Sequence, residues 1–521
     1  MARLARWVGI AGCVGFLAAS SWLGSLERSA PPHADVVLEG GVPATFYLPG
    51  TDPGLAAFLD APPRGERPPA VALMHGFASD RLAMSVLARR LARAGYAVLA
   101  FDASGHGQNR NPFRRSFGRS DSFHAEVAAA VDFLRADPRV DGERIVVMGH
   151  SMGAGASLDF ATRDAGLDAT VLISGGWTLH GPHRPPNALF IYAALDPETI
   201  EERSLELAAR IAGVTSIEPD RTYGAPSRGT GVRVVEVPGA DHLTIVWDAA
   251  AALQIVRWLD DVFARPPTAA VAPDRRPIAS LLAALSLLLA LPAFGVVVGR
   301  LAPSREQPPA GHPLAGLAAI ALALLATMPL LAVDAPFALL SVEVGDVVVS
   351  HLGLAGVVLL VAAVLLGRPS LAPPLRDLLA ALPAAAVGIL GLYVLLLPVG
   401  AVLHRLALVP ERAVVFALAS LGLLPFSLAY QGLLRRGSPR RAALVCVAGR
   451  ALVLGVLGLG EWLGLLSFVV VLMLPALAVA FLLFELLCAF VYATSRNVSV
   501  VASLDAAWLG LVFAATMPVS L

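Results

Sequence analysis

The sequence predicts an α/β fold with a doubly wound, mostly parallel sheet, followed by an all-α transmembrane helical domain. Composition is the first reason: of 521 residues, 56% are hydrophobic and only 15% are charged, below the charged share of about 25% in soluble domains. Pattern is the second reason. In the first half, apolar runs of strand length alternate with amphipathic helical segments, whereas the second half consists of Leu, Ala and Val in blocks of roughly 20 residues, enough to cross a bilayer.

This change of pattern divides the chain into four parts. We expect residues 1–33 to form an N-terminal membrane anchor, 34–267 the α/β domain, 268–277 a linker, and 278–521 a polytopic domain of about eight transmembrane helices. The segments apolar and long enough to span a membrane are 7–24, 278–298, 314–333, 351–367, 377–403, 413–434, 442–462, 465–492 and 499–519.

The N-terminal apolar segment allows three interpretations. The run Ala-Ala-Ser-Ser at 18–21 offers a small-residue cleavage site for a signal peptide, and Ile-Ala-Gly-Cys ending at Cys13 resembles a lipoprotein site. However, the apolar stretch before Cys13 is very short and the chain after it stays apolar. We therefore favour an uncleaved anchor.

Charge and cysteine content exclude several classes of function. The 39 basic residues, all Arg, balance 39 acidic ones to a net charge of +0, so nothing electrostatic favours a nucleic-acid partner. The three cysteines, Cys13, Cys446 and Cys488, lie in apolar segments, which suits neither a disulfide framework nor a zinc site. We expect no nucleic acid, no metal and no cofactor.

Arginine placement predicts the orientation, because cytoplasmic loops retain positive charge. With the N-terminus inside, most arginines near the ends of spans are cytoplasmic: Arg3, Arg6, Arg300, Arg305, Arg368, Arg376, Arg435, Arg436, Arg440, Arg441 and Arg496. A smaller set flanks the α/β domain and opposes this bias: Arg28, Arg265, Arg275 and Arg276. We expect a multi-pass protein of a bacterial cell membrane, with the α/β domain on the outer face.

Strands and helices alternate through the α/β domain. The predicted strands are 70–74, 96–101, 144–148, 169–174, 188–194 and 232–237. The predicted helices are 81–94, 122–136, 152–162, 197–212 and 243–263. This alternation predicts a parallel sheet covered on both faces, with the active groups at the carboxyl ends of the strands.

One of these strand ends carries a candidate nucleophile. Residues 149–153, Gly-His-Ser-Met-Gly, match Gly-x-Ser-x-Gly between a predicted strand and a predicted helix. The glycines permit a sharp turn that leaves the Ser151 hydroxyl exposed at the helix N-terminus. The pentapeptide alone is common in a Gly-rich chain, so its setting is what favours a nucleophile over a plain tight turn.

A serine nucleophile needs a base, and the base needs an orienting carboxylate. Asp196 follows the strand 188–194, and His242 follows the strand 232–237. We therefore predict the catalytic residues Ser151, Asp196 and His242. Other acidic and histidine side chains lie nearby in sequence but fit these positions less well: Glu198, Asp241, His180 and His183.

The tetrahedral intermediate of acyl transfer needs two N–H donors for its oxyanion. We predict the amide of Met152, directly after the nucleophile, and the amide of Phe77, in the loop after the strand 70–74. Gly76 lets the backbone turn in that loop. His75 is expected to shape the loop rather than to transfer protons.

These motifs together resemble the α/β-hydrolase superfamily over residues of roughly 36–264. The motifs occur in the superfamily's order: His75-Gly76-Phe77, Asp102-Ala103-Ser104-Gly105-His106-Gly107, Gly149-His150-Ser151-Met152-Gly153, Leu195-Asp196-Pro197 and Gly239-Ala240-Asp241-His242. The chain looks most like the serine aminopeptidase-like, lysophospholipase-like and dienelactone hydrolase-like branches, which include esterases, lipases and peptidases. Fold and catalytic triad transfer with such a resemblance, but the substrate does not.

The resemblance says nothing about residues 277–521, but together with the predicted spans it implies a membrane-anchored serine hydrolase that cleaves carboxylic ester bonds through an acyl-enzyme, without a metal or organic cofactor. Its expected partners are a small-molecule or lipid-like acyl substrate and membrane lipid, and the oligomeric state stays open. One alternative is a serine peptidase of the aminopeptidase-like branch. Another is a membrane transporter or scaffold that carries a non-catalytic hydrolase domain.

Two further features concern the surroundings of the site and the spans. Only about a dozen residues separate the strands 169–174 and 188–194, where many relatives insert a lid, so the site should be open or roofed by another part, such as the loop 107–121. Charged residues inside spans are paired or functional by default. We predict that Arg450 and Glu485 pair across a helical hairpin.

Overall fold

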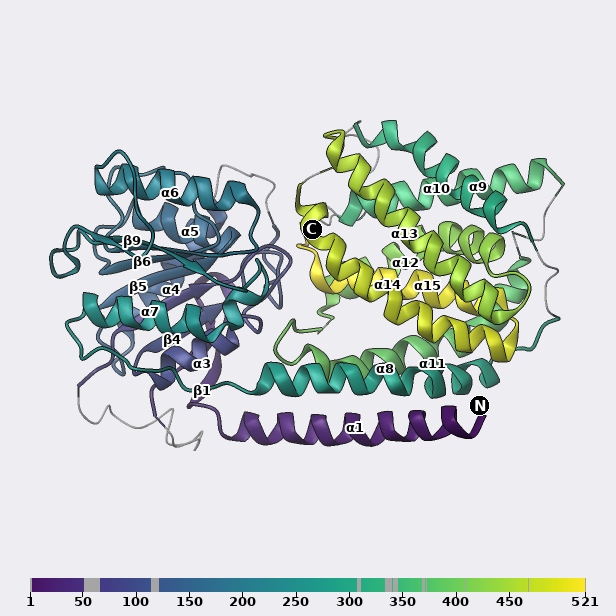
Figure 1. Cartoon of the computed structure of the whole chain (residues 1–521), viewed down its shortest axis with the longest axis horizontal. Helices are drawn as coiled ribbons and strands as arrows, with labels where there is room; N and C mark the ends of the chain where they lie inside the picture. Colours follow the sequence, from purple (N-terminus) through teal and green to yellow (C-terminus); the bar gives the residue numbers. More distant parts are fainter. Residues whose placement is uncertain are drawn as a thin grey trace.

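The computed structural model describes residues 2–50, 66–113, 121–306, 311–332, 340, 345–367, 371, 373–406, 408–466 and 468–520. A sheet with its covering helices and a bundle of long helices lie side by side (Figure 1). The predicted fold class is confirmed: a mostly parallel α/β domain is joined to an all-helical region of membrane-spanning type.

The sheet has nine strands within the described residues. Their bounds are β1 His33–Leu38, β2 Val42–Tyr47, β3 Ala70–Met74, β4 Ala97–Phe101, β5 Ile145–His150, β6 Ala169–Ile173, β7 Ala188–Ala193, β8 Thr222–Tyr223 and β9 Val232–Val237. They lie in the order β1-β2-β4-β3-β5-β6-β7-β9-β8. The six predicted strands are the parallel core, whereas β1, β2 and β8, which were not predicted, pair antiparallel at the edges.

Helices cover both faces of the sheet. Their bounds are α3 Ser85–Arg93, α4 Asp121–Ala136, α5 Met152–Ala161, α6 Glu198–Ala212 and α7 Ala249–Val262. Strand side chains alternate between the faces: Val71 and Leu73 pack with α3 and α7, while Ala72 and Met74 pack with α4 and α5. Because both faces are covered, function is confined to the edges of the sheet, and the carboxyl edge is where parallel strands bind ligands.

The other half consists of long apolar helices. Their bounds are α1 Ala2–Arg28, α8 Arg276–Leu301, α9 Pro313–Thr327, α10 Gly345–Leu365, α11 Leu375–Gly400, α12 Pro410–Leu434, α13 Pro439–Trp462, α14 Phe468–Ser495 and α15 Val498–Thr516. In the part of the chain that the structure describes, nine helices are long and apolar enough to cross a membrane, α9 together with the 3₁₀ helix that continues it to Leu330. Many of their large apolar side chains point outward, including Leu314, Leu365 and Leu444, which is typical of contact with lipid.

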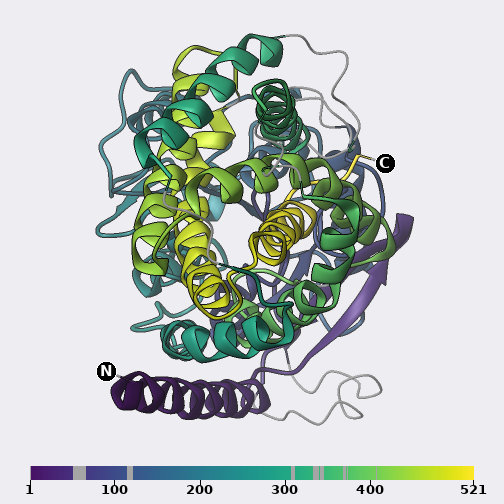
Figure 2. The ribbon, with the colours of Figure 1, turned by 90° about the vertical axis from the view of Figure 1, so that its right-hand side faces the viewer.

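Helix α1 lies at the edge of the bundle, alongside α8 (Figures 1 and 2). The contact depends on small residues: a Cβ added at Gly12 would lie 2.6 Å from the backbone nitrogen of Ala290, and one at Gly15 would lie 2.7 Å from the Ser286 hydroxyl. Glycines therefore allow the two backbones to approach closely, as in other membrane helix pairs.

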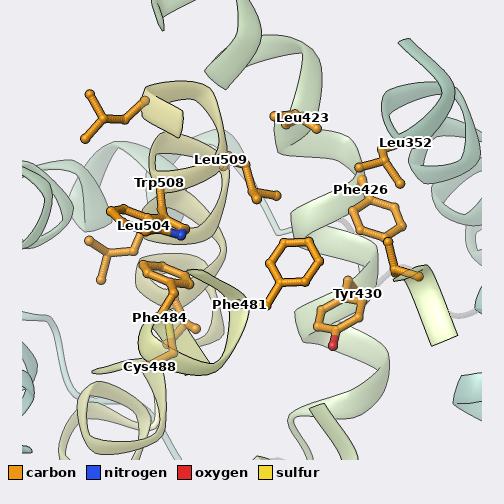
Figure 3. Close-up of a cluster of buried hydrophobic side chains, with 14 of the residues drawn as sticks. Leu352, Leu423, Phe426, Tyr430, Phe481, Phe484, Cys488, Leu504, Trp508 and Leu509 are labelled. Atoms are coloured by element: carbon orange, nitrogen blue, oxygen red, sulfur yellow. The ribbon is translucent and has the colours of Figure 1, made fainter. Parts of the chain in front are cut away.

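Helix α15 is the most buried of the nine, and its apolar side chains meet those of α12 and α14. Figure 3 shows this cluster, in which Trp508 of α15 stacks on Phe484 of α14 with ring centroids 5.7 Å apart. Tyr430 and Phe426 of α12 face the same space. The core of the bundle is thus made by residues that are far apart in sequence.

Four charged side chains are buried at one level of the bundle. Arg435 pairs with Glu485, and Arg450 pairs with Asp505. Gln431 connects the two pairs, because its amide donates to Asp505 Oδ2 at 3.2 Å and its carbonyl accepts from Arg435 Nε at 2.7 Å. The predicted pairing of Arg450 with Glu485 is wrong, since α15 and the end of α12 also reach this level and supply closer partners.

Candidate active site

The turn between β5 and α5 carries Ser151 at the carboxyl edge of the sheet. Its φ of 51° lies in the left-handed region that non-glycine residues seldom adopt. The turn needs glycines on both sides, because a Cβ added at Gly149 would lie 2.1 Å from the carbonyl carbon of Gly153. Ser151 directly precedes the first residue of α5, as the sequence predicted.

The three predicted catalytic side chains lie together. His242 Nε2 is 3.1 Å from Ser151 Oγ, and His242 Nδ1 is 2.6 Å from Asp196 Oδ1. The serine and the histidine are 91 residues apart in sequence, and they meet because parallel strands end at the same edge. The Asp196 side chain is 1% exposed and that of His242 is 12% exposed, so the aspartate is enclosed while the histidine keeps access to solvent.

Asp196 is held from two further directions. Its Oδ2 accepts hydrogen bonds from the Ser174 hydroxyl at 2.6 Å and from the Ala193 amide at 2.9 Å. Burial raises the pKa of Asp196, but the hydrogen bonds from His242, Ser174 and the Ala193 amide outweigh burial and lower it below the ordinary value. The carboxylate is therefore ionised and its orientation is fixed.

The alternative acids and bases are placed elsewhere. Asp241 Oδ1 accepts from the amides of Leu243 and Thr244, both at 2.9 Å, just before the short 3₁₀ helix η3, Thr244–Trp247. The remaining candidates are exposed side chains with no recorded bond to Ser151 or His242: Glu198, His180 and His183.

His150, inside the Gly-x-Ser-x-Gly motif, supports the loop of the histidine. Its Nε2 donates to the backbone carbonyl of His242 at 2.8 Å. Burial and the neighbouring His242 lower the pKa of His150 to about 3, so the ring stays neutral and one nitrogen keeps the proton that it donates. The motif position was predicted, but this role of its second residue was not.

The loop after β3 passes close to the nucleophile. A Cβ added at Gly76 would lie 3.3 Å from Ser151 Cβ and 2.8 Å from His150 Nδ1, so only glycine fits there. Phe77 follows Gly76, and Met152 follows Ser151, which places the two predicted oxyanion donors on the two backbone segments that meet at the serine hydroxyl.

Histidine 75 shapes this loop, as expected. His75 Nδ1 donates to the Gly76 carbonyl at 2.7 Å, and His75 Nε2 accepts from the Ala103 amide at 3.0 Å. The two bonds fix the tautomer with the proton on Nδ1. Burial lowers the pKa of His75, so this ring is a neutral brace between the loops after β3 and β4.

The helical half binds the same loop through Asp80. Its Oδ2 accepts from His404 Nδ1 at 2.7 Å and from the Arg405 amide at 2.6 Å, both in the connection between α11 and α12. Burial raises the pKa of Asp80, but the interactions with His404 and the Arg405 amide outweigh burial and hold it well below the ordinary value. A membrane-side connection therefore fixes the loop that carries Phe77.

Arg412, in the first turn of α12, fixes the loop after β4. Its guanidinium donates to the carbonyls of Gly105 at 2.7 Å and Gly107 at 3.0 Å, and also to that of Ala514 at 2.7 Å. The backbone of Val519, just beyond α15, exchanges hydrogen bonds with this loop: it donates to Gly105 at 2.9 Å and accepts from residue 113 at 2.8 Å. These contacts were not predicted from the sequence, in which Arg412 is only a charged residue at the start of an apolar span.

A second set of polar residues supports the loop after β4 from inside the soluble half, that is, the α/β domain of residues 33–275. Glu126 accepts from the Ser104 hydroxyl, from the Ser104 amide at 3.1 Å and from Asn109 Nδ2 at 3.1 Å. Burial raises the pKa of Glu126 to about 7, although these hydrogen bonds act in the opposite direction. Asp102 pairs with Arg81 in the same region.

Where many relatives insert a lid, this chain has only a short connection, as the sequence predicted, and the helical half lies against the loops beside the site instead. The segment between β6 and β7 has no helix or strand. The connection from α11 to α12, the start of α12 and the residues after α15 contact the loops after β3 and β4. Of the predicted roof loop, residues 114–120 lie outside the described residues. Among the described residues, no group of three or more His, Cys, Asp or Glu side chains is arranged to hold a metal ion.

Comparison with known proteins relates the α/β domain to hydrolases. The family model "Serine aminopeptidase, S33" matches residues 65–211, which include Ser151 and Asp196. Cutinase est1 of Thermobifida alba is 27% identical over 137 residues, which are 25% of this chain and 43% of the cutinase. Cutinase est2 of the same organism is 24% identical over 197 residues, 36% of this chain and 58% of the cutinase. The chain therefore spans about half the length of these curated relatives.

A crystal structure of the hypothetical protein PA2218 from Pseudomonas aeruginosa is similar over 44% of this chain and 92% of its own, with 17% identity and a TM-score of 0.31.

Proposed function

Because the soluble half is an α/β-hydrolase domain, we propose that this protein is a membrane-anchored serine hydrolase that cleaves carboxylic ester bonds with Ser151, His242 and Asp196. One observation carries the proposal. A hydroxyl lies 3.1 Å from an imidazole nitrogen, and the other ring nitrogen lies 2.6 Å from an enclosed carboxylate. This is the arrangement that turns a weak nucleophile into an effective one.

The reaction has two halves. Ser151 Oγ attacks the carbonyl carbon while its proton passes to His242 Nε2, and the bond from that carbon to the alcohol oxygen then breaks as His242 returns the proton to the leaving alcohol. The acyl group stays on Ser151. Water, deprotonated by His242, attacks the acyl carbon, releases the carboxylic acid and restores the serine.

Two groups stabilise the charges that form along this path. Asp196 holds the proton of His242 on Nδ1, so that Nε2 faces the serine, and it balances the imidazolium. The amides of Phe77 and Met152 donate to the oxyanion of the tetrahedral intermediate, an interaction in which each donor contributes about 3 kcal/mol to the barrier.

An ester is favoured over an amide by the relatives, since both reported relatives are cutinases. The family description names an aminopeptidase, so a peptidase is the second candidate. A peptidase that removes N-terminal residues needs an acidic group for the substrate amine. Asp241, beside His242, and Asp80, in the loop after β3, are both engaged in other bonds.

Membrane anchoring rests on the nine long apolar helices of the described chain. The close packing of α1 on α8 favours a retained N-terminal helix over a cleaved signal peptide, because removal would expose the face of α8 at Ser286 and Ala290 against which the glycines of α1 pack. The arginine bias supports a position of the hydrolase domain on the outer face of a bacterial cell membrane.

The test uses full-length protein in detergent. Wild type is expected to hydrolyse 4-nitrophenyl butyrate, and Ser151→Ala should lower the rate by at least about 10³-fold. Ser204→Ala is the control, because that hydroxyl bonds only to its own helix, and it should keep the wild-type rate. Ser151→Ala with the wild-type rate would contradict the proposal, and turnover of aminoacyl 4-nitroanilides alone would favour the peptidase.

A further inference from the structure

The rim of the active site lies at the level where the spans end. On one flank, Asp80 in the loop after β3 binds His404, four residues beyond the end of α11. Arg412, in the first turn of α12, binds the carbonyl of Gly105. Since spans end where the hydrocarbon ends, this flank of the site is held at the surface of the bilayer.

The other side of the active site, which carries His242, is also connected to the end of a membrane helix. The indole of Trp247, five residues after His242, donates to the Ala83 carbonyl at 2.9 Å. Two residues further, the Ser85 hydroxyl accepts from Arg276, the first residue of α8, at 3.1 Å. The catalytic histidine is therefore linked through the start of α3 to the start of a membrane helix.

Two exposed leucines adjoin the catalytic residues on this rim. In the described part of the soluble half, residues 33–50, 66–113 and 121–275, the exposed large apolar side chains are Val37, Leu195, Val214 and Leu243. Leu195 is 68% exposed and directly precedes Asp196, and Leu243 is 51% exposed and directly follows His242. Both exposed side chains therefore lie directly beside the triad, on a rim whose loops are bound by the ends of membrane helices.

The two leucines belong to one stretch of the rim. The Leu195 amide donates to the Ala240 carbonyl at 3.0 Å, which joins the loops after β7 and β9. Val214 lies elsewhere, just beyond the end of α6, a 15-residue helix that starts at the carboxyl edge and carries the chain about 22 Å along its axis.

We propose that Leu195 and Leu243 insert into the surface of the lipid bilayer that surrounds the helical half, and that the substrate is an acyl ester embedded in that bilayer. This inference rests on the proposed function and adds the place from which the substrate arrives. Lipid is the occupant that fits, because the rim is fixed to the ends of membrane helices, and because transfer of leucine from water to an apolar phase is favourable. The ester carbonyl of a lipid lies at the headgroup boundary, and the loop that passes Ser151 is bound at the ends of the spans, where that boundary lies.

The activity test compares two substrates on the same vesicles. Full-length protein is reconstituted in dioleoyl phosphatidylcholine, and rates are measured for a long-chain fluorogenic ester dissolved in the bilayer and for an acetyl ester dissolved in water. The double variant Leu195→Ser/Leu243→Ser is expected to lower the ratio of the bilayer rate to the water rate by about tenfold or more. Val214→Ser is the matched control and should keep the wild-type ratio. A double variant with the wild-type ratio would overturn the inference.

A second readout does not depend on catalysis. A phosphatidylcholine with a photoreactive diazirine in its acyl chain is included in the vesicles, and labelled peptides are identified by mass spectrometry. We expect label on the peptides that contain Leu195 and Leu243 and none on the peptide that contains Val214. Absence of label on both leucine peptides would overturn the inference even if esters are hydrolysed, whereas label without hydrolysis of any ester would refute the proposed function and leave the lipid contact standing.

Discussion

The two halves of the molecule bury polar side chains in different ways. At the rim of the sheet, the His242 side chain remains 12% exposed, and its Nε2 faces a hydroxyl. In the helical half, Arg435 is 0% and Glu485 is 3% exposed, and they bind each other. An ionisable group that keeps access to the outside can exchange protons with a substrate, whereas an enclosed pair can only hold helices together. Burial of charge therefore does not identify a catalytic site unless access accompanies it.

The largest expected effect concerns the triad, in which His242 keeps access to solvent. Asp196→Asn should lower kcat for ester hydrolysis by about 10⁴-fold, because the amide favours the wrong tautomer of His242 and cannot balance its positive charge. Steady-state kinetics of the folded variant measures this. The counterpart among the enclosed ion pairs of the helical half is Asp505→Asn, which should leave kcat of the folded protein unchanged. A comparable loss of kcat in both variants would remove the distinction between the triad and the enclosed pairs.

The enclosed pairs should act on stability. Glu485→Gln leaves Arg435 without its charged partner and is expected to cost about 3–5 kcal/mol of unfolding free energy. Denaturant unfolding in mixed micelles, followed by circular dichroism of the helices, measures this. Arg435→Met/Glu485→Leu removes both charges and should recover most of the loss. A double variant less stable than the single variant would show that the pair itself, and not the unpaired charge, determines stability.

Glu126 gives the soluble half a pH-dependent stability. Its pKa is raised to about 7 in the folded protein, so the folded state binds a proton more tightly than the unfolded state, where the carboxyl has an ordinary pKa near 4.5. This stabilisation is fully present below pH 4.5 and is lost as the pH rises through 7. The difference in unfolding free energy between Glu126→Gln and wild type should therefore shift in favour of the variant by about 3 kcal/mol between pH 5 and pH 8. This figure assumes about 1.4 kcal/mol per pKa unit.

Thermal unfolding at several pH values, with near-ultraviolet signals of the soluble half, measures this gain. Asp164→Asn provides the control, because hydrogen bonds from Arg135 and the Gly166 amide outweigh burial and lower the pKa of that surface carboxyl. Its stability difference from wild type should be constant over this pH range. A stability difference from wild type that is also constant for Glu126→Gln would contradict the raised pKa of Glu126.

The smallest effect is expected at the interface where the start of α12 contacts the loop after β4. Arg412→Met removes the donors to the carbonyls of Gly105 and Gly107 and should lower kcat about tenfold, with little change in KM for a small soluble ester, because the loop beside the site becomes less ordered. Arg412→Lys, which keeps one donor group, should recover part of the rate. Arg110→Met is the control, since Arg110 pairs with Glu411 at the same interface but is largely exposed. Equal rates for Arg412→Met and wild type would show that the helical half does not position the loop.

The parallel core and the triad could be predicted from sequence because both depend on local rules. Each core strand is a short apolar run between helical patterns, and Ser151, Asp196 and His242 each follow such a run. The edge strands did not stand out: β2 contains Pro43 and β8 has only two residues. Strands of this kind are defined by their neighbours rather than by their own pattern.

Contacts between distant segments could not be predicted in the same way. Nothing in the local sequence relates Asp80 to His404, or Arg412 to the glycines after β4, because these pairs depend on how two folded halves meet. The pairing of Arg450 failed for the same reason, since the prediction considered one helical hairpin while the structure brings Asp505 from a third helix. Residue type and depth identify which side chains need a partner, and only the packing selects the partner.

The central claim is that Ser151 is a nucleophile activated by His242. The most direct measurement treats the folded full-length protein with a fluorophosphonate and locates the adduct by mass spectrometry. We expect one adduct, on Ser151, with labelling slowed at least about 10³-fold in His242→Ala and unaffected in His183→Ala. Folded wild-type protein that takes no label, or takes it equally well without His242, would contradict the claim.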